Sequence, residues 1–167
     1  MPAVSTFLAL VVVTPLCLQA QDATLPLESV KLEGTAVSQN VVLQLADLRI
    51  GASVNKGAIE TACAKLQDTG IFQSIQYRYG PSPGPKRGYA VTLTLADQSA
   101  LTASAIDVPG VQEAGLWTWL ASLFPAFDHK VPGNDAAQQL IARKLEERLG
   151  SRLGGEHLTA RLETDIR

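Results

Sequence analysis

The spacing of hydrophobic and polar positions changes at about residue 70, from a helical repeat to strict alternation. Before this point, apolar residues recur at intervals of three and four, which predicts a helix over residues 55–69. After it, apolar and polar residues alternate over residues 75–79, which predicts a half-buried strand. Gly70 joins the two, because glycine takes a positive φ without steric cost and turns the chain back at once. Phe72 then falls where it can close the end of the core between helix and sheet.

Similar patterns surround this segment and complete one unit. Residues 27–33 read as a strand, and a helix follows from Ser38 as its N-cap to Ile50 and Gly51. A loop rich in proline and glycine, residues 80–88, leads into a second alternating run at 89–95. Residues 27–96 therefore predict an α+β fold of order β-α-α-β-β, in which a helix pair covers one face of a three-stranded mixed sheet.

The order starts again after residue 100. The pattern predicts a strand over residues 101–106, a helix over 111–124 and an irregular stretch between two prolines. Asn134 is a good N-cap for the clearest helix of the chain, which runs to Gly150. An alternating run over 157–166 predicts one more strand. Residues 101–167 are therefore interpreted as a second, diverged or truncated copy, one strand short of a complete unit.

The first twenty residues form an apolar segment without any charge. Its core of about twelve residues, 7–18, is shorter than the roughly 20 that span a bilayer. We therefore interpret residues 1–20 as a secretory signal peptide with cleavage after Ala20. A buried N-terminal helix is the alternative, and lipid attachment at Cys17 is disfavoured because no small residue precedes it.

Composition and the remaining motifs exclude several classes of function. The chain of 167 residues has a net charge of -2 and is 5% aromatic, so neither a basic surface nor a stacking platform for nucleic acid is expected. One thiol after residue 20, Cys63, makes no internal disulfide or metal cluster. Asp128, His129 and His157 lack the spacing of zinc ligands. The glycines of residues 80–88 lack the ending of a phosphate-binding loop. We therefore expect no metal, no cofactor and no enzyme activity.

At this point the first unit resembles a known family. Its order of elements, Gly34 after the first strand, Gly51 between the helices and above all the sequence LQDTGIFQSIQYRY resemble a polypeptide-transport-associated (POTRA) domain. In that family the second helix ends in a Leu-x-x-Thr-Gly-x-Phe pattern. Those positions are here Leu66, Thr69, Gly70 and Phe72. The resemblance covers residues 27–96.

The resemblance implies a place and a role. POTRA repeats lie in the periplasm before the β-barrel of outer-membrane assembly and secretion proteins of the BamA and TamA type, where they bind partner subunits and unfolded chains. Such a barrel needs at least 8 strands, which do not fit after residue 101, so we expect this chain to be the N-terminal part of a longer protein. A standalone periplasmic adaptor, a scaffold of two-partner secretion or cell division, and a small exported enzyme are the alternatives.

Partner binding is expected at an open sheet edge. An unpaired strand can add a strand from another polypeptide through its main-chain groups. In the family the second strand commonly lies at the edge, which is here residues 72–79. The predicted partner-binding residues are Phe72, Ser74, Gln76, Arg78 and, on the later helix, Trp119. The alternatives are a solvated edge that never pairs, a groove between the second helix and this strand, and, for Trp119, a packed contact between the two units.

Overall fold

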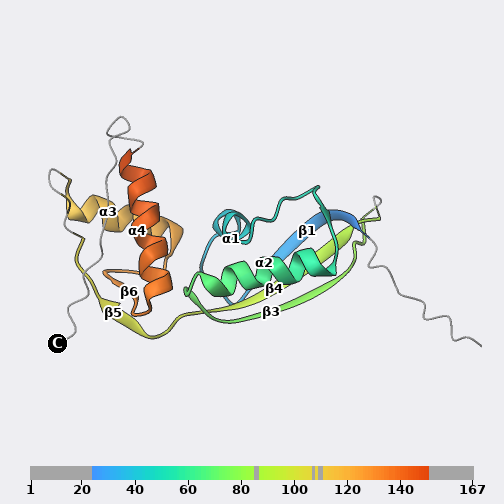
Figure 1. Cartoon of the computed structure of the whole chain (residues 1–167), viewed down its shortest axis with the longest axis horizontal. Coiled ribbons are helices and arrows are strands. Elements are labelled where there is room, and N and C mark those ends of the chain that lie inside the picture. The colour runs from blue at the N-terminus through green and yellow to red at the C-terminus, as the bar shows by residue number, and fades with distance from the viewer. Residues whose placement is uncertain (1–23, 85–86, 107, 109–110, 151–167) are drawn as a thin grey trace, which may run out of the picture.

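The computed structural model describes residues 24–84, 87–106, 108 and 111–150 (Figure 1). These residues form two sheets, and the elements around each sheet are described below as two units. The first unit contains the elements up to β4, and the second contains those from β5 onward. The elements, in order, are β1 (Leu25–Glu33), α1 (Gln39–Ala46), β2 (Ser53–Val54), α2 (Lys56–Asp68), β3 (Phe72–Pro81), β4 (Tyr89–Asp97), β5 (Leu101–Ala103), α3 (Glu113–Leu123), β6 (Lys130–Pro132) and α4 (Asp135–Gly150).

The sheet of the first unit has four strands in the order β2-β1-β4-β3. β4 lies between β1, with which it is parallel, and β3, with which it is antiparallel. The predicted α+β class and mixed sheet are confirmed, but the sheet has one strand more than the predicted three. The additional strand, β2, pairs with β1 through Leu25–Val54 and Pro26–Ser53. Two residues are too few to produce an alternating pattern, so β2 could not be predicted from the sequence.

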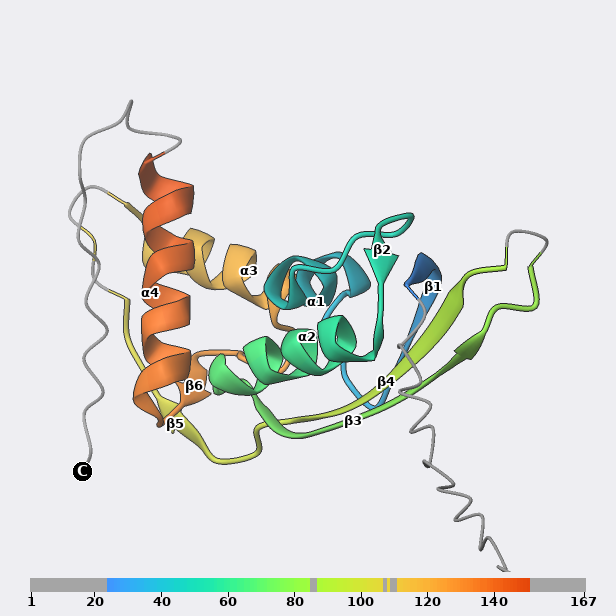
Figure 2. The ribbon, with the colours of Figure 1, turned by 45° about the vertical axis from the view of Figure 1, so that its right-hand side comes forward.

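Helices α1 and α2 cover one face of this sheet and enclose the core (Figures 1 and 2). Ile59, Ala62 and Leu66 of α2 are buried as the apolar stripe predicts, whereas Cys63 is half-buried. Helix α2 also begins where predicted, and the side chain of Asn55 caps it by accepting a hydrogen bond of 2.9 Å from the Ala58 N–H. The completely buried aliphatic side chains of the first unit are Leu27, Val42, Ile59, Leu66 and Leu93.

Helix α1 ends earlier than the sequence predicts. The predicted end was at Ile50 and Gly51, but the helix stops at Ala46, and Asp47 takes the left-handed conformation with φ 54°. Aspartate tolerates this conformation better than most residues, so it can end a helix where no glycine is present. Gly51 is also left-handed, with φ 86°, but it lies in the following loop and donates a hydrogen bond of 2.7 Å to the Leu27 carbonyl.

A bulge at the start of β3 lets Phe72 and Ile75 face the same side of the sheet. Phe72 pairs with Asp97 and Ser74 pairs with Ala96, so β3 has one extra residue opposite β4 at this point. Without that residue, two positions three apart would lie on opposite faces. Phe72 is 2% exposed and fills the core as predicted.

The second unit repeats part of the pattern of the first. The order β5-α3-β6-α4 corresponds to β1-α1-β2-α2, and in both units the two strands are antiparallel. β5 is shorter than the predicted strand, and β6 falls within the stretch predicted to be irregular. The predicted strand over residues 157–166 lies outside the described residues. That residues 101–167 are an incomplete copy of the first unit therefore stays a prediction.

The two units meet where α2 ends and α4 begins. The side-chain amide of Asn134 donates a hydrogen bond of 2.8 Å to the Gly70 carbonyl, and its oxygen accepts one of 2.9 Å from the Ala137 N–H. Asn134 therefore caps α4, as predicted, and also binds the first unit. Gly70 has φ 69°, and a Cβ atom there would collide with the Asn134 side chain and lie 3.0 Å from the Ala137 nitrogen. Glycine is thus required at position 70 both by its conformation and by the approach of α4.

Replacing Gly70 by alanine should destabilise the protein strongly. The left-handed conformation costs about 1–2 kcal/mol for a residue with a Cβ, and the collision with Asn134 adds to it, so we expect the free energy of unfolding to fall by about 2 kcal/mol or more. Denaturant unfolding measures this change. Gly115→Ala is the matched control, because Gly115 lies in α3 with no atom within 4 Å of an added Cβ. It should stabilise by about 0.5–1 kcal/mol. A Gly70→Ala protein of unchanged stability would contradict this requirement.

Asn134→Asp should loosen the junction while leaving α4 capped. Aspartate keeps an acceptor for the Ala137 N–H but has no donor for the Gly70 carbonyl. We expect residual dipolar couplings of the two units to fit one alignment tensor in the natural protein and two different tensors in the variant. Helix content, measured by circular dichroism, should not change. If a single tensor still fits the variant, the Asn134–Gly70 hydrogen bond does not hold the units together.

Candidate functional site

β3 lies at the edge of the sheet, as predicted, and presents a row of polar side chains. It pairs with β4 on one side, from Phe72–Asp97 to Pro81–Tyr89, and with no strand of the described residues on the other. The side chains of Ser74, Gln76 and Arg78 are exposed on the face of the sheet away from the helices. Three of the predicted partner-binding residues are thus brought together in one row, two residues apart.

The edge of β3 lacks most of the features that protect exposed strands. Natural edges are commonly blocked by proline, by bulges or by charged side chains that point inward. In β3 the bulge precedes Ser74 and the proline, Pro81, is the last residue. Between them the helix-side residues are Ile75, Tyr77 and Tyr79, none of them charged. About seven residues, or roughly 23 Å of backbone, are therefore open to pairing.

The opposite edge of the sheet is closed by the protein itself. β2 covers the start of β1, and Leu27 exchanges hydrogen bonds of 2.8 and 2.7 Å with Ala52 and Gly51 of the neighbouring loop. Further along β1, the Gln39 side chain donates a hydrogen bond of 2.9 Å to the Val30 carbonyl. The main-chain groups of this edge are therefore partly occupied, which leaves β3 as the longer accessible edge.

An ion-pair row crosses the solvent face of the sheet beside this edge. Glu33 of β1 lies 2.7 Å from the Lys31 ammonium and 3.9 Å from the Arg78 guanidinium. The hydrogen bond and charge of Lys31, and more weakly the charge of Arg78, hold the pKa of Glu33 below its usual value. The Arg78 side chain is nevertheless 81% exposed, so its guanidinium stays available to an acidic group on a partner.

On the other face of β3, a hydrogen bond joins the strand to α2. The Tyr77 hydroxyl donates to Glu60 at 3.0 Å, and Lys56 lies 3.7 Å from the same carboxylate. The hydrogen bond to Glu60 is the main cause that raises the pKa of Tyr77, and burial contributes less. Half-buried Ile75 and Cys63 lie along the same border between strand and helix. This border is the groove considered as an alternative binding surface.

Tyr79 is an apolar position of the strand predicted to be half-buried, but it is exposed, and the lengths of the elements explain the difference. Ten residues of strand span about 33 Å, whereas thirteen residues of helix span about 20 Å. The hairpin of β3 and β4 therefore extends past the start of α2 (Figure 2). Tyr79 lies on the helix side of this overhang and is 36% exposed. The exposure of Tyr79 could therefore have been inferred from the predicted lengths of the helix and the strand.

Phe72 and Trp119, the other two predicted partner-binding residues, lie elsewhere. Phe72 is 2% exposed, so its side chain supports β3 from within and does not reach the surface. Trp119 lies on α3 in the second unit, where it is half-buried and the Arg148 guanidinium of α4 stands 5.8 Å from its ring centre. This contact lies within the second unit, whereas the alternative for Trp119 was a packed contact between the two units. The structure brings neither side chain to the exposed row on β3.

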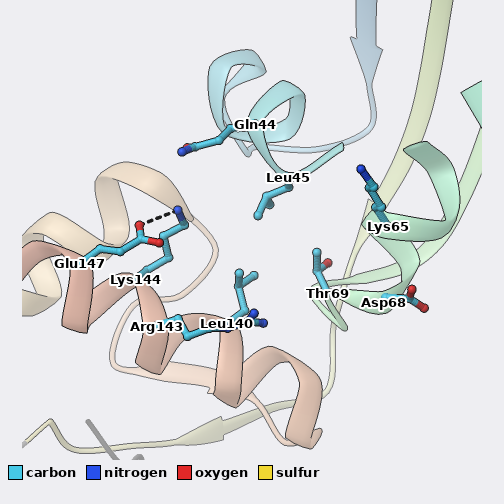
Figure 3. A pocket seen from close by; sticks show the side chains of 9 residues that line it. All are labelled: Gln44, Leu45, Lys65, Asp68, Thr69, Leu140, Arg143, Lys144 and Glu147. Carbon is cyan, nitrogen blue, oxygen red and sulfur yellow. Dashed lines mark hydrogen bonds and ion pairs between the residues drawn. The ribbon is translucent and has the colours of Figure 1, made fainter. Parts of the chain in front are cut away.

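A second feature is an open cleft of about 420 Å³ between the two units (Figure 3). Leu45 and Leu140 contribute apolar surface, and most of the remaining side chains are charged or polar. Lys144 is paired with Glu147 at 2.8 Å, and Lys65 is paired at 2.8 Å with Asp47 outside the cleft. The residues that line the cleft are Gln44, Leu45, Lys65, Asp68, Thr69, Leu140, Arg143, Lys144 and Glu147. Side chains of both charges line the cleft, so it does not favour a ligand of either sign.

Other groups that could carry chemistry are isolated from one another. The carboxylate of Asp128 lies 3.9 Å from the His129 ring nitrogen, and His157 lies outside the described residues. Within the described ranges, no three histidine, cysteine, aspartate or glutamate side chains lie close enough to hold a metal ion. Burial raises the pKa of the Cys63 thiol, which disfavours the reactive thiolate. Also within those ranges, no helix is long and apolar enough to cross a membrane.

Comparison with known proteins gives matches among solved structures alone. No family model and no curated protein matches the chain. The chain is similar to POTRA1-2 of the periplasmic domain of Omp85 from Anabaena, with 12% identity and a TM-score of 0.44, over 78% of this chain and 81% of that one. It is also similar to the N-terminal domain of Omp85 from the thermophilic cyanobacterium Thermosynechococcus elongatus, with 16% identity and a TM-score of 0.43.

CdiB is also among the similar structures, and the covered shares differ widely. CdiB from Acinetobacter baumannii has 14% identity and a TM-score of 0.37, over 50% of this chain and 17% of that one. The match to the Thermosynechococcus domain spans 78% of this chain and 53% of that one. The chain therefore spans about half of that domain and a smaller part of CdiB. Two of the similar structures, both of Omp85 from Anabaena, are POTRA domains.

The hydrogen bond between Tyr77 and Glu60 should make stability fall at alkaline pH. A tyrosine whose pKa is raised by folding stabilises the fold fully below its ordinary pKa of about 10, and this stabilisation is lost as pH rises through the higher folded-state value. Glu60→Gln should shift the titration of Tyr77 back toward the ordinary value, as followed by NMR. Asp68→Asn, at the far end of the same helix, is the control and should not change it. A Tyr77 titration insensitive to Glu60→Gln would show that the hydrogen bond is not its cause.

Proposed function

We propose that the protein is an interaction module that binds an extended segment of another polypeptide along β3. The observation that carries this proposal is the open edge: about seven residues of β3 without proline, bulge or inward charge. Main-chain hydrogen bonds supply affinity in this mode of binding and depend little on sequence. Such an edge therefore suits partners that differ in sequence, such as unfolded chains.

The sequence resemblance to POTRA domains supports a more specific setting. The pattern of Leu66, Thr69, Gly70 and Phe72 coincides with the structural turn that delivers β3 to the edge of the sheet. We infer that the protein acts in the periplasm, after export, within an outer-membrane β-barrel assembly or protein translocation system. Its partners are then assembly subunits and unfolded outer-membrane or secreted chains. In this setting the module acts by binding and not by catalysis.

The proposal can be tested with a synthetic nine-residue peptide of alternating valine and threonine. Adding it should slow the amide hydrogen exchange of every second residue between 74 and 80, since outward N–H groups alternate along a strand. Exchange in β1 and β2 should not change. If the peptide protects no amide of β3, the proposed function is wrong.

Two lysines on the edge should prevent this binding. The double variant Ser74→Lys, Gln76→Lys places charges beside Arg78, as natural edges do to avoid pairing. We expect the neutral peptide to bind about tenfold more weakly, or ~1.4 kcal/mol. The control adds the same charges away from β3, at the exposed residues Ser53 and Gln67. Equal binding by the two double variants would contradict an edge-mediated mode.

A further inference from the structure

A cluster of three tyrosines lies at the hairpin end of the open edge. The ring of Tyr79 is stacked with that of Tyr77, with centres 6.3 Å apart and planes inclined by 20°. It meets the ring of Tyr89 edge to face, at 5.4 Å and 82°. Both geometries are favourable for aromatic pairs. The rings of Tyr77 and Tyr89 thus pack against Tyr79, which stays exposed on the edge strand.

A surface of this kind differs from the scattered apolar residues of most protein surfaces. In the described residues two large hydrophobic side chains are exposed, Ile50 at 51% and Tyr79 at 36%. Ile50 lies in the loop after α1, whereas Tyr79 lies on the strand that is open to pairing. Tyrosine offers a large, rigid contact area at low entropic cost and is frequent among residues that dominate binding energy.

The register of strand pairing puts this cluster in the path of an added strand. A residue placed opposite Tyr79 points to the same face, with its Cβ about 4.5–5.5 Å away. The residues two positions along that strand meet Tyr77 and then Ile75, both half-buried beside α2. The alternate residues point to the solvent face, where they meet Arg78 and Gln76. One side of the added strand thus meets apolar surface, and the other meets a polar row with an exposed guanidinium.

We propose that Tyr79, supported by the rings of Tyr77 and Tyr89, anchors an added strand whose apolar residues recur at every second position, and that this anchor fixes its register on β3. The inference rests on the proposed function. It adds a preference for certain side chains in the bound segment, which main-chain hydrogen bonds do not provide. The favoured occupant is an extended segment with aromatic or aliphatic residues on one side and neutral or acidic residues, complementary to Arg78, on the other. Segments without this alternation still pair, but weakly and in several registers.

The test compares two nine-residue peptides of the same composition. In the first, tyrosine and valine alternate with threonine and one glutamate; in the second, the same residues are ordered so that no alternation remains. We expect the alternating peptide to bind about tenfold more tightly. Tyr79→Ala should remove this preference, and Ile50→Ala, the other exposed apolar residue, should leave it intact. A spin label on one end of the alternating peptide should broaden amides at one end of β3 in the natural protein and along the whole strand in Tyr79→Ala.

The outcomes separate this inference from the proposed function. If both peptides slow amide exchange in β3 with equal affinity and Tyr79→Ala changes nothing, the tyrosine anchor is wrong and the edge-binding function stands. If neither peptide affects β3, both are wrong. If the alternating peptide is preferred but Ile50→Ala abolishes that preference, the anchor lies elsewhere and the inference also fails.

Discussion

The left-handed backbone of Gly70 is the constraint on which the rest of the structure depends. It ends α2 and sends the chain into β3 within two residues, so that Phe72 enters the core and β3 reaches the outer position beside β4. The same glycine lies against Asn134, whose side chain caps α4 and binds the Gly70 carbonyl. One position without a Cβ therefore sets both the direction of the edge strand and the attachment of the second unit. A side chain there would disturb both at once.

The unequal lengths of helix and strand turn this arrangement into an asymmetric surface. Because α2 is shorter than β3 by about 13 Å, the helix covers Ile75 and Tyr77 but leaves Tyr79 uncovered. The solvent face of the same strand carries Ser74, Gln76 and Arg78. The two ends of β3 therefore differ, because α2 covers one end and leaves the other uncovered. This difference distinguishes the two directions along the strand, even though its main-chain groups repeat uniformly. Side chains, and not the hydrogen-bond ladder, can therefore distinguish one register from another.

The sequence predicted the elements that are governed by local rules and missed those governed by distant contacts. The α2 helix and the role of Gly70 follow from spacing and from glycine's conformational freedom, and both are confirmed. β2 and β6, of two and three residues, are too short to leave a pattern and exist because β1 and β5 offer partners. Asn134 was predicted as a cap, but its bond to Gly70, 64 positions away, is set by how the two units meet. The polar row on β3 was predicted from the alternating pattern. Phe72 was predicted both to close the core and to bind a partner. Its burial confirms the first prediction and leaves the second without support.

An edge that is open to other chains must still avoid pairing with its own copies, and the ends of β3 limit that risk. Long, flat edges aggregate because pairing can extend without a boundary. Here the bulge at Phe72 closes one end and Pro81 the other, so a pairing strand gains about seven residues of ladder at most. Parallel pairing of two copies in register would also place Arg78 beside Arg78, which like-charge repulsion disfavours. A short, bounded edge of this kind can bind an extended segment reversibly, because the small number of main-chain hydrogen bonds keeps the affinity moderate. The tyrosine anchor then determines which segments stay bound longest.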